Sequence, residues 1–571
     1  MNKKYNLVRS LLFASVMLLS VSCSDDDDFT SINTVFDITS EQIGELGITN
    51  NVRVPNEGGT YNFNIIASPE VTWSVTTNEV VGGDWLLVDG TGEHQGEGKI
   101  TVTAISDTDG GEPRTGSVVI TNLKTKISAT INFEQKDKDI LIPDGWKDET
   151  EFDFGNEETR FGYYYVETKD VVLFWEKSFG PDPTKYSVNT NDAFDPIEAI
   201  NQTQEGFDFM VDVAGFANRT TSCAAKNKIL VVVHCDTDGT SNKGGAVGYG
   251  RPGVGIFELS SNRLKKNPYG YMGVMHHELC HCFQYISHYD GSSEMGWSGP
   301  IYEMTSQWSL LRKFSDWGHL EPSHAKDFLK ATYKAFMHKD NQYHSPYVLE
   351  YWEMKHDKNM VSYLWKSSKS EDNKDIVEVY KRVTGIDQET FNDEMFDACR
   401  RFVTWDIPRI DAGYDGWKNI HCTKLDKLEE GKYRISVEQC PQNYGYNAIK
   451  MDVPEAGTVV RLNFNGSTEL PGFPIQNRLY RGWRYGFLAV ANDGTRTYGD
   501  MYKENQVIEF TVPENTQYLW FVVMGAPTTH WKFKEDNEGH WPYEFTVEGT
   551  KVSDDANDTS KIDNVPDKFD R

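Results

Sequence analysis

Met275-His276-His277-Glu278-Leu279-Cys280-His281 places two histidines four residues apart and a glutamate directly after the first. In an α-helix, residues four apart lie on one face, so the imidazoles of His277 and His281 can hold one metal ion together while Glu278 lies beside it. Apolar residues flank the motif at helical spacing and cover much of the helix, which predicts a helix buried within a domain. They are Tyr271, Met272, Val274, Leu279, Cys282, Phe283 and Ile286.

A third metal ligand is expected downstream, because a catalytic zinc site uses three protein ligands and leaves one position open. Gln284 and Ser287 stand where a longer motif would have a glycine and a third histidine, and His288 is one residue out of register. Glu294 lies in a loop-like stretch, where a carboxylate is more simply a solvated side chain.

Glu303 is the better candidate for the third ligand. Ser298 to Pro300 have the composition of a helix start, and the apolar residues Ile301, Met304 and Trp308 follow at helical spacing. The sequence therefore predicts a second helix that carries one inward glutamate.

Residues 270 to 313 resemble the gluzincin metallopeptidases, in which two histidines of one helix and a glutamate of the next bind zinc. The resemblance implies that His277, His281 and Glu303 bind Zn2+ and that Glu278 is the general base. The spacing from His281 to Glu303 also fits the enhancin-like, mucin-directed branch of these enzymes. A degenerate site on an inherited scaffold is the alternative interpretation.

An oxyanion-stabilising residue is expected after the second helix, because gluzincins commonly place a Tyr or His there. Asn341 to Tyr347 offers three candidates for this catalytic role, Tyr343, His344 and Tyr347, in no fixed order. An aromatic packing segment is the alternative for any one of them.

Strands are predicted upstream of the motif. The apolar, β-branched runs 171–175, 228–234 and 254–259 are typical of buried strands. Gly248 and Gly250 precede the last run, and an edge strand at this place can pair with an extended peptide substrate.

The N-terminus resembles a bacterial lipoprotein signal, because a basic start and a short apolar run end at Cys23. Residues 1–22 are predicted to be the signal peptide, and residues 23–47 an acidic linker after the lipidated Cys23. The run Asp25 to Asp28 is similar to the one that marks surface lipoproteins of the Bacteroides group. It implies an outer-membrane protein, lipid-anchored and exposed on the cell surface.

The predicted fold is multidomain: an N-terminal all-β immunoglobulin-like sandwich, a central α+β zincin-like metallopeptidase domain and a C-terminal all-β sandwich. Residues 48–136 alternate in hydrophobicity, and Trp73, Trp85 and Gln135 belong to a pattern that resembles the BACON domain, a spacer or a carbohydrate binder. The remaining predicted segments are the peptidase domain 140–412, the second sandwich 413–550 and a disordered acidic tail 551–571.

The net charge of the chain restricts the kinds of partner that it can bind. The formal net charge of −29 and the lack of basic clusters argue against nucleic acid and anionic lipid surfaces. The expected partners are a protein or glycoprotein substrate and a glycan, with the membrane reached only through Cys23. Trp531, Trp541 and Tyr543 are candidates either for stacking on sugar rings or for packing in the core. Cys422 and Cys440 are candidates for a disulfide.

The leading functional hypothesis is therefore a surface-anchored zinc metallopeptidase that hydrolyses protein or glycoprotein, including mucin-like substrates, with a metal-activated water. The alternative is a glycan- or mucin-binding lipoprotein whose zincin fold is inactive.

Overall fold

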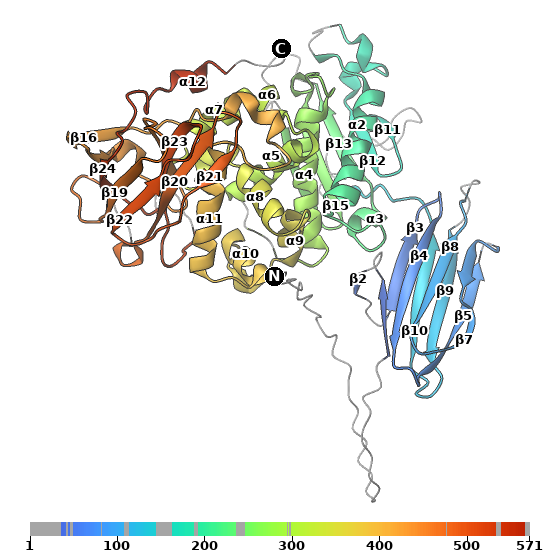
Figure 1. Cartoon of the computed structure of the whole chain (residues 1–571). Coiled ribbons are helices and arrows are strands. Elements are labelled where there is room, and N and C mark those ends of the chain that lie inside the picture. The colour runs from blue at the N-terminus through green and yellow to red at the C-terminus, as the bar shows by residue number, and fades with distance from the viewer. Residues whose placement is uncertain are drawn as a thin grey trace, which may run out of the picture. The chain divides into compact units, whose positions relative to one another are not determined.

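The structure, a computed structural model, divides into two compact units, Met1–Asp139 with Asn218–Lys226, and Ile140–Ala217 with Asn227–Arg571 (Figure 1). The predicted signal peptide, Cys23 and the acidic run after it lie outside the described residues. No helix within the described ranges is long and apolar enough to cross a membrane. The described residues are 36–40, 44–45, 49–81, 83–107, 113–143, 163–187, 192–235, 246–293, 295, 299–474, 477–532 and 538–565.

The first unit holds two five-stranded sheets, in the orders β2-β1-β4-β8-β6 and β3-β10-β9-β5-β7. Their inward side chains form one core around Phe63, Trp73, Trp85 and Ile100, as the alternation predicts. The bounds are β1 Phe36–Ser40, β2 Gly44–Glu45, β3 Thr49–Val54, β4 Gly59–Ala67, β5 Thr72–Val81, β6 Leu86–Asp89, β7 Gly92–Gln95, β8 Gly98–Ala104, β9 Arg114–Asn122, β10 Ser128–Gln135 and the short helix α3 Cys223–Lys226.

The predicted linker 23–47 is too long. Its last part forms strands β1 and β2, because Ile38 is buried in the core of the first unit and β1 pairs with β4. The buried tryptophans of this unit present no free face to solvent; the Trp73 indole N–H donates to the Gly96 carbonyl at 2.8 Å.

The second unit begins with a sheet of order β11-β12-β13-β15-β14. Strands β12, β13 and β15 are parallel, and β14 runs antiparallel to β15 at the edge. The three buried strands confirm the prediction for the apolar runs. The bounds are β11 Tyr164–Glu167, β12 Val171–Trp175, β13 Ile229–His234, β14 Ala246–Arg251 and β15 Val254–Ser260.

Helices fill the middle of the second unit, between this sheet and the C-terminal strands (Figure 1). The two helices predicted around the motif and around Glu303 are both present, as α4 and α5. The bounds are α2 Pro196–Asp208 with its π-helical extension η4 Phe209–Val213, α4 Met272–Tyr289, α5 Pro300–Lys313, α6 Trp317–Leu320, α7 Pro322–Lys330, α8 Tyr347–Lys355, α9 Met360–Ser367, α10 Ile376–Thr384 and α11 Gln388–Phe402.

The C-terminal strands form two facing sheets, in the orders β16-β17-β24-β19-β22 and β18-β23-β20-β21. Trp541 and Tyr543 are fully buried in the core between them, which decides for packing rather than sugar stacking. The bounds are β16 Leu425–Glu429, β17 Lys432–Ile435, β18 Tyr446–Met451, β19 Val459–Gly466, β20 Trp483–Ala491, β21 Arg496–Tyr498, β22 Val507–Thr511, β23 Thr516–Gly525 and β24 Tyr543–Glu548.

The helical region and the C-terminal sheets pack on each other. On α11, Asp393 pairs with Arg484 of β20 at 2.6 Å, and Asn392 donates to the Pro527 carbonyl at 3.0 Å. The predicted domain boundary at residue 412 thus lies inside one compact unit. Cys422 and Cys440 are both buried free thiols, so the disulfide proposed from the sequence is absent between them.

The acidic tail is ordered up to residue 565, against the prediction of disorder. Helix α12 (Ser560–Asp563) buries Ile562 completely, and the Lys326 ammonium donates to the Asp563 carbonyl at 2.9 Å. The buried residues Ala556, Ile562 and Val565, backbone hydrogen bonds such as that from Ser553 N–H to the Lys450 carbonyl, and lysine contacts hold this tail, and average polarity does not reveal them. Residues 566–571 lie outside the described part.

Strand β14 lies directly on α4 because its inward residues are glycines. A Cβ at Gly248 would stand 2.2 Å from the Glu278 carbonyl oxygen and 2.7 Å from the His281 Cβ, and one at Gly250 would stand 2.6 Å from the Tyr285 Cβ. The edge strand therefore approaches the helix that carries the motif more closely than any side chain would allow.

We expect Gly248→Ala to lower the free energy of unfolding by about 1–3 kcal/mol, because the strand must move off the helix. Thermal unfolding followed by circular dichroism measures the loss. Gly416→Ala is the control, since a Cβ there would meet no atom closer than 3.7 Å. Equal melting temperatures for the two variants would contradict the close packing.

Candidate metal centre

Helix α4 is buried on nearly all sides. His276 faces α2, where a Cβ at Gly206 would lie 3.0 Å from its Nδ1, and its ring packs edge-on against Phe209. Burial lowers the pKa of His276 to about 3, so this histidine is neutral at ordinary pH. Cys280 and Cys282 are fully buried packing residues. The candidate site is formed by the polar side chains on the face of α4 that points away from α2.

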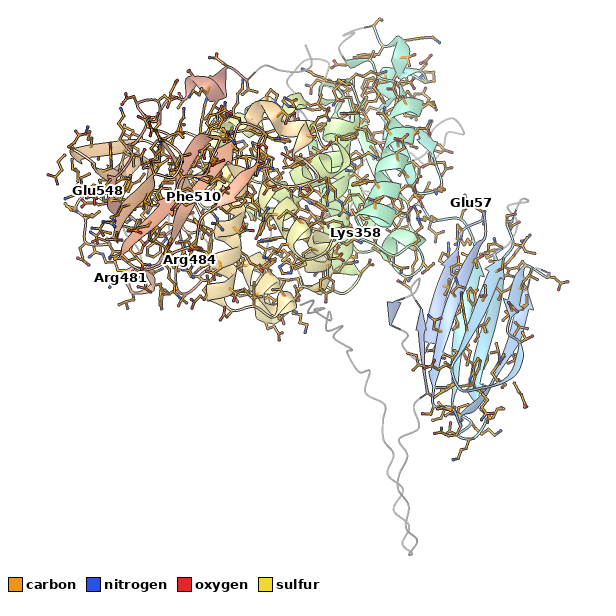
Figure 2. The ribbon with its side chains drawn as sticks, in the orientation of Figure 1. Glu57, Lys358, Arg481, Arg484, Phe510 and Glu548 are labelled. Atoms are coloured by element: carbon orange, nitrogen blue, oxygen red, sulfur yellow. The ribbon has the colours of Figure 1, made fainter. Side chains whose placement is uncertain are left out.

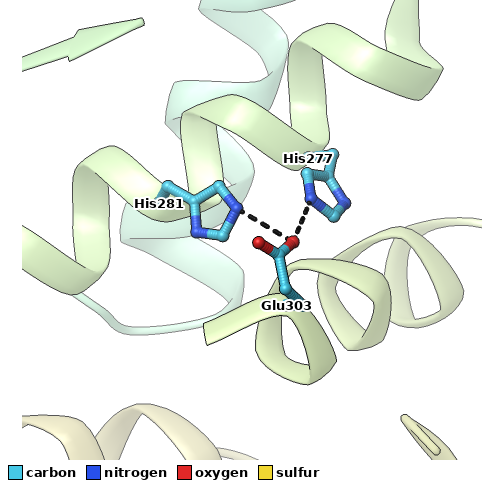
Figure 3. A group of neighbouring side chains, drawn as sticks. All are labelled: His277, His281 and Glu303. Atoms are coloured by element: carbon cyan, nitrogen blue, oxygen red, sulfur yellow. Dashed lines mark hydrogen bonds and ion pairs between the residues drawn. The ribbon is translucent and has the colours of Figure 1, made fainter. Parts of the chain in front are cut away.

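His277, His281 and Glu303 meet at one point, as Figure 3 shows. The Glu303 Oε2 lies 3.0 Å from the His277 Nε2 and 3.4 Å from the His281 Nε2. The two imidazoles project from successive turns of α4, and the carboxylate rises from the first turn of α5. The three residues singled out from the sequence as ligands are thus brought together.

These donors fit a zinc ion. Zinc binds histidine nitrogen and carboxylate oxygen at about 2.0–2.2 Å, so the donors of a tetrahedral site lie about 3.3–3.5 Å apart. The two measured separations are close to that value, and all three donor atoms lie within 4.8 Å of one another. Two imidazoles and one carboxylate leave a fourth position for water or substrate.

The charges of the three side chains depend on each other. Burial alone would raise the pKa of Glu303, but hydrogen bonds with His277 and His281 outweigh it, and the pKa lies well below the usual range. Burial lowers the pKa of His281, but the hydrogen bond and the charge of Glu303 raise it, and the net result is a raised pKa. A carboxylate ionised in this way is ready to bind a cation.

Gln284 fixes the orientation of His281, a role that we did not predict. Its Nε2 donates to the Tyr302 carbonyl at 2.8 Å, which turns its Oε1 toward the His281 Nδ1 at 2.9 Å. The Nδ1 therefore carries a hydrogen, with Ser306 Oγ also 3.2 Å away, and the Nε2, which donates to Glu303 here, is the nitrogen that a metal ion would take in place of that proton. The spacing of three residues on one helix was the only sequence signal.

Glu278 lines the same cavity as the three ligands. Its side chain is only 6% exposed, and its charge contributes to raising the pKa of both His281 and Tyr343, so the carboxylate lies near these two residues of the site. The cavity has a volume of about 2040 Å3, well above that of a pocket for a single small molecule. Its edge includes Ala246, Val247 and Gly248 of β14.

Of the three candidates for oxyanion stabilisation, only Tyr343 lies at the site. Its ring is 6.1 Å from that of His277, its hydroxyl bonds with Glu303, and it lines the cavity. Burial, with the charge and hydrogen bond of Glu303, raises the pKa of Tyr343 to about 12, so it is a neutral donor at pH 7.

His344 and Tyr347 do not line the cavity, which corrects their assignment as catalytic candidates. His344 lies 3.8 Å from the Asp327 carboxylate, and Tyr347 packs in the core with its ring 4.4 Å from that of Trp405. The helix α8 begins at Tyr347 and turns that side chain into the core. Glu294 lies outside the described residues.

A buried ionic network holds α5 in place. The guanidinium of Arg312, near the end of α5, bonds with Glu353 of α8 at 2.8 Å, and Arg409 contacts the other oxygen of Glu353 at 2.8 Å. Arg409 also reaches Glu350 at 3.0 Å. The helix that presents Glu303 is thereby fixed to its neighbours at the end far from the site.

Comparison with known proteins gives a family without a known function. A family described as of unknown function, DUF6055, matches residues 132–554. No curated protein matches the chain.

The chain has partial structural likenesses to several solved proteins. WR4, an MSP family member of C. elegans, is 11% identical, and the match covers 18% of this chain and 95% of that one with a TM-score of 0.13. The Yersinia pseudotuberculosis-derived mitogen is 8% identical, and the match covers 24% of this chain and 92% of that one with a TM-score of 0.16. A protein from Bacteroides thetaiotaomicron is 17% identical, and the match covers 20% of this chain and 95% of that one with a TM-score of 0.13.

We expect Gln284→Met to weaken zinc binding by about 10–100-fold, because His281 then loses the acceptor that fixes its tautomer. Competition with a chromogenic chelator measures the dissociation constant. Ser287→Ala is the control on the same helix: among the described residues the Ser287 hydroxyl bonds with the Phe283 carbonyl and not with a site residue, so the zinc affinity of this variant should stay that of the unmodified chain. Unchanged affinity in Gln284→Met would show that Gln284 does not position the ligand.

Proposed function

The chain belongs to DUF6055, a family of unknown function, and we propose that its second unit is a zinc-dependent peptidase of the gluzincin type. The observation that carries the proposal is the convergence of the His277, His281 and Glu303 donors on one point of a large cavity, with Glu278 beside them. The same donor set and the same order of helices occur in that class of enzymes.

Zinc, when bound, supplies a Lewis acid that lowers the pKa of a water molecule and polarises the carbonyl of a peptide bond. Glu278 accepts the proton that the attacking water loses and returns it to the leaving amine. Glu278 and His281 are three residues apart on α4, so their side chains are neighbours on the helix surface, and the charge of Glu278 acts on His281.

The edge strand β14 supports a peptide as the substrate. Within the described residues β14 pairs with β15 on one side only, and its first three residues line the cavity. An extended chain can therefore pair with the outer edge of β14 and cross the site with its scissile bond near Glu278. The Tyr343 hydroxyl, held near Glu303, is the donor for the oxygen that becomes negative when water adds to the carbonyl.

The remaining parts of the chain fit an anchored enzyme. We propose that Cys23 carries a lipid that holds the protein at the outer membrane, and that the first unit is a BACON-like spacer. Of the tryptophans that motivated a glycan-binding alternative, Trp73, Trp85 and Trp541 are buried, and Trp531 is half-buried against the core of the C-terminal sheets. No observation on the described residues favours that second function.

The purified protein should bind about one zinc per chain and cleave protein. Glu303→Ala should lose both metal and activity, because two ligands do not hold a catalytic zinc. Glu278→Gln should keep the metal and lose cleavage by roughly 1000-fold or more, since it removes the base and leaves the ligands. Elemental analysis and a protein digest read by mass spectrometry measure the two properties.

Full proteolysis by a metal-loaded Glu278→Gln protein would overturn the proposed mechanism. Absence of zinc from a folded wild-type protein would overturn the proposed function itself.

Tyr343→Phe should lower kcat by about 10–1000-fold and leave KM nearly unchanged, because the lost hydrogen bond is made in the transition state. His344→Gln is the matched control: it changes the adjacent residue, which does not line the cavity, and should leave both constants unchanged. Equal kcat values for Tyr343→Phe and the unmodified chain would assign the oxyanion to another group.

A further inference from the structure

The cavity has a basic segment on one wall. Its lining includes three Lys or Arg residues, and all three come from the run Arg263-Leu264-Lys265-Lys266. This run is notable in a chain with 57 basic and 86 acidic residues, and it is a short basic cluster that we did not single out from the sequence. Lys266 pairs with Glu198. Arg263 and Lys265 are exposed and form no ion pair with a described residue, so two positive charges face the cavity.

The acidic residues of the lining do not neutralise these two charges. Glu278 and Glu303 belong to the proposed catalytic site, and Asp192 is fully buried. Glu321 accepts a hydrogen bond from the Trp317 indole at 2.9 Å and lies 3.6 Å from the His324 Nε2. Arg263 and Lys265 are therefore the exposed charges that remain for an incoming molecule.

The basic segment lies at the N-terminal end of α4. Residues 261–271 connect β15 to this helix, and the Asn267 amide nitrogen would lie 3.2 Å from a Cβ at Gly273, in the first turn. Gly273 and Tyr285 both line the cavity, so it extends along about 18 Å of the helix on both sides of the ligands.

The contacts of strand β14 with α4 determine which end of a bound substrate would lie near the basic segment. Gly248 touches α4 at Glu278 and His281, and Gly250 touches it at Tyr285, so β14 and α4 advance in the same sense. A substrate that pairs antiparallel with β14 runs the opposite way. Its C-terminal side then points to the start of α4, where Arg263 and Lys265 are.

We propose that Arg263 and Lys265 select peptide substrates with carboxylates on the C-terminal side of the scissile bond, about two to four residues beyond it. The carboxylates come from Asp or Glu side chains or from the chain terminus itself. This inference rests on the proposed peptidase function and names its substrate class.

A digest of a diverse peptide mixture tests the preference. Mass spectrometry of the products of the unmodified protein should show Asp and Glu enriched about five- to tenfold C-terminal to the cut, or cuts clustered near free C-termini. The double variant Arg263→Glu with Lys265→Glu should remove or invert this preference. The control double variant, Lys358→Glu with Arg481→Glu, should keep it; both residues are exposed, do not line the cavity and are labelled in Figure 2.

A binding measurement separates this inference from the proposed function. Zinc-loaded Glu278→Gln protein is titrated with fluorescent peptides of equal length: amidated Asp-containing, amidated Asn-containing, and Asn-containing with a free carboxyl terminus. One or both of the carboxylate peptides should bind about five- to tenfold more tightly than the amidated Asn peptide, with the difference falling at high salt. Which of the two carboxylate peptides binds more tightly shows whether the recognised carboxylate belongs to a side chain or to the chain terminus.

Each result decides one point. If the protein cleaves peptides without any preference for carboxylates and the three peptides bind equally, the substrate class is wrong and the peptidase function stands. If nothing is cleaved, the peptidase function fails, and the binding comparison alone supports or overturns the role of Arg263 and Lys265. A preference that survives the double variant would also overturn it.

Discussion

The packing of α5 against α4 is the constraint on which the site depends. Neither helix alone holds more than two of the three donors, and Glu303 reaches the imidazoles only because the first turn of α5 lies beside the middle of α4. The Gln284 amide connects the two, since it bonds both with His281 and with the Tyr302 carbonyl of α5. The Gln284 side chain thus holds His281 in place and contacts the helix that carries Glu303.

Elements with a strong local pattern could be predicted from the sequence. The strands β12, β13 and β15 and the helices α4 and α5 match the expected segments because their apolar periodicity reflects burial on a fixed face. The convergence of the three candidate ligands is of the same kind: His277 and His281 are related by one turn of helix, and Glu303 lies at an inward position of the next helix.

Features that depend on contacts distant in sequence could not be predicted. The role of Gln284 depends on a carbonyl 18 residues away, and the separation of Tyr343 from Tyr347 depends on the point where α8 begins. The ordered tail is a third case: α12, which carries the buried Ile562, contacts α7, which lies more than 200 residues earlier in the chain. Composition and spacing contain no signal for such contacts.

The network of Arg312, Glu353 and Arg409 bears on how metal binding and folding are related. It anchors α5 through bonds that do not involve the site, so the geometry of Glu303 is set when the protein folds. Little conformational entropy is then lost when an ion enters, in contrast to small domains that fold only around their metal. A metal ion bound at this site would therefore be exchangeable, and replacing one divalent metal by another would leave the scaffold unchanged.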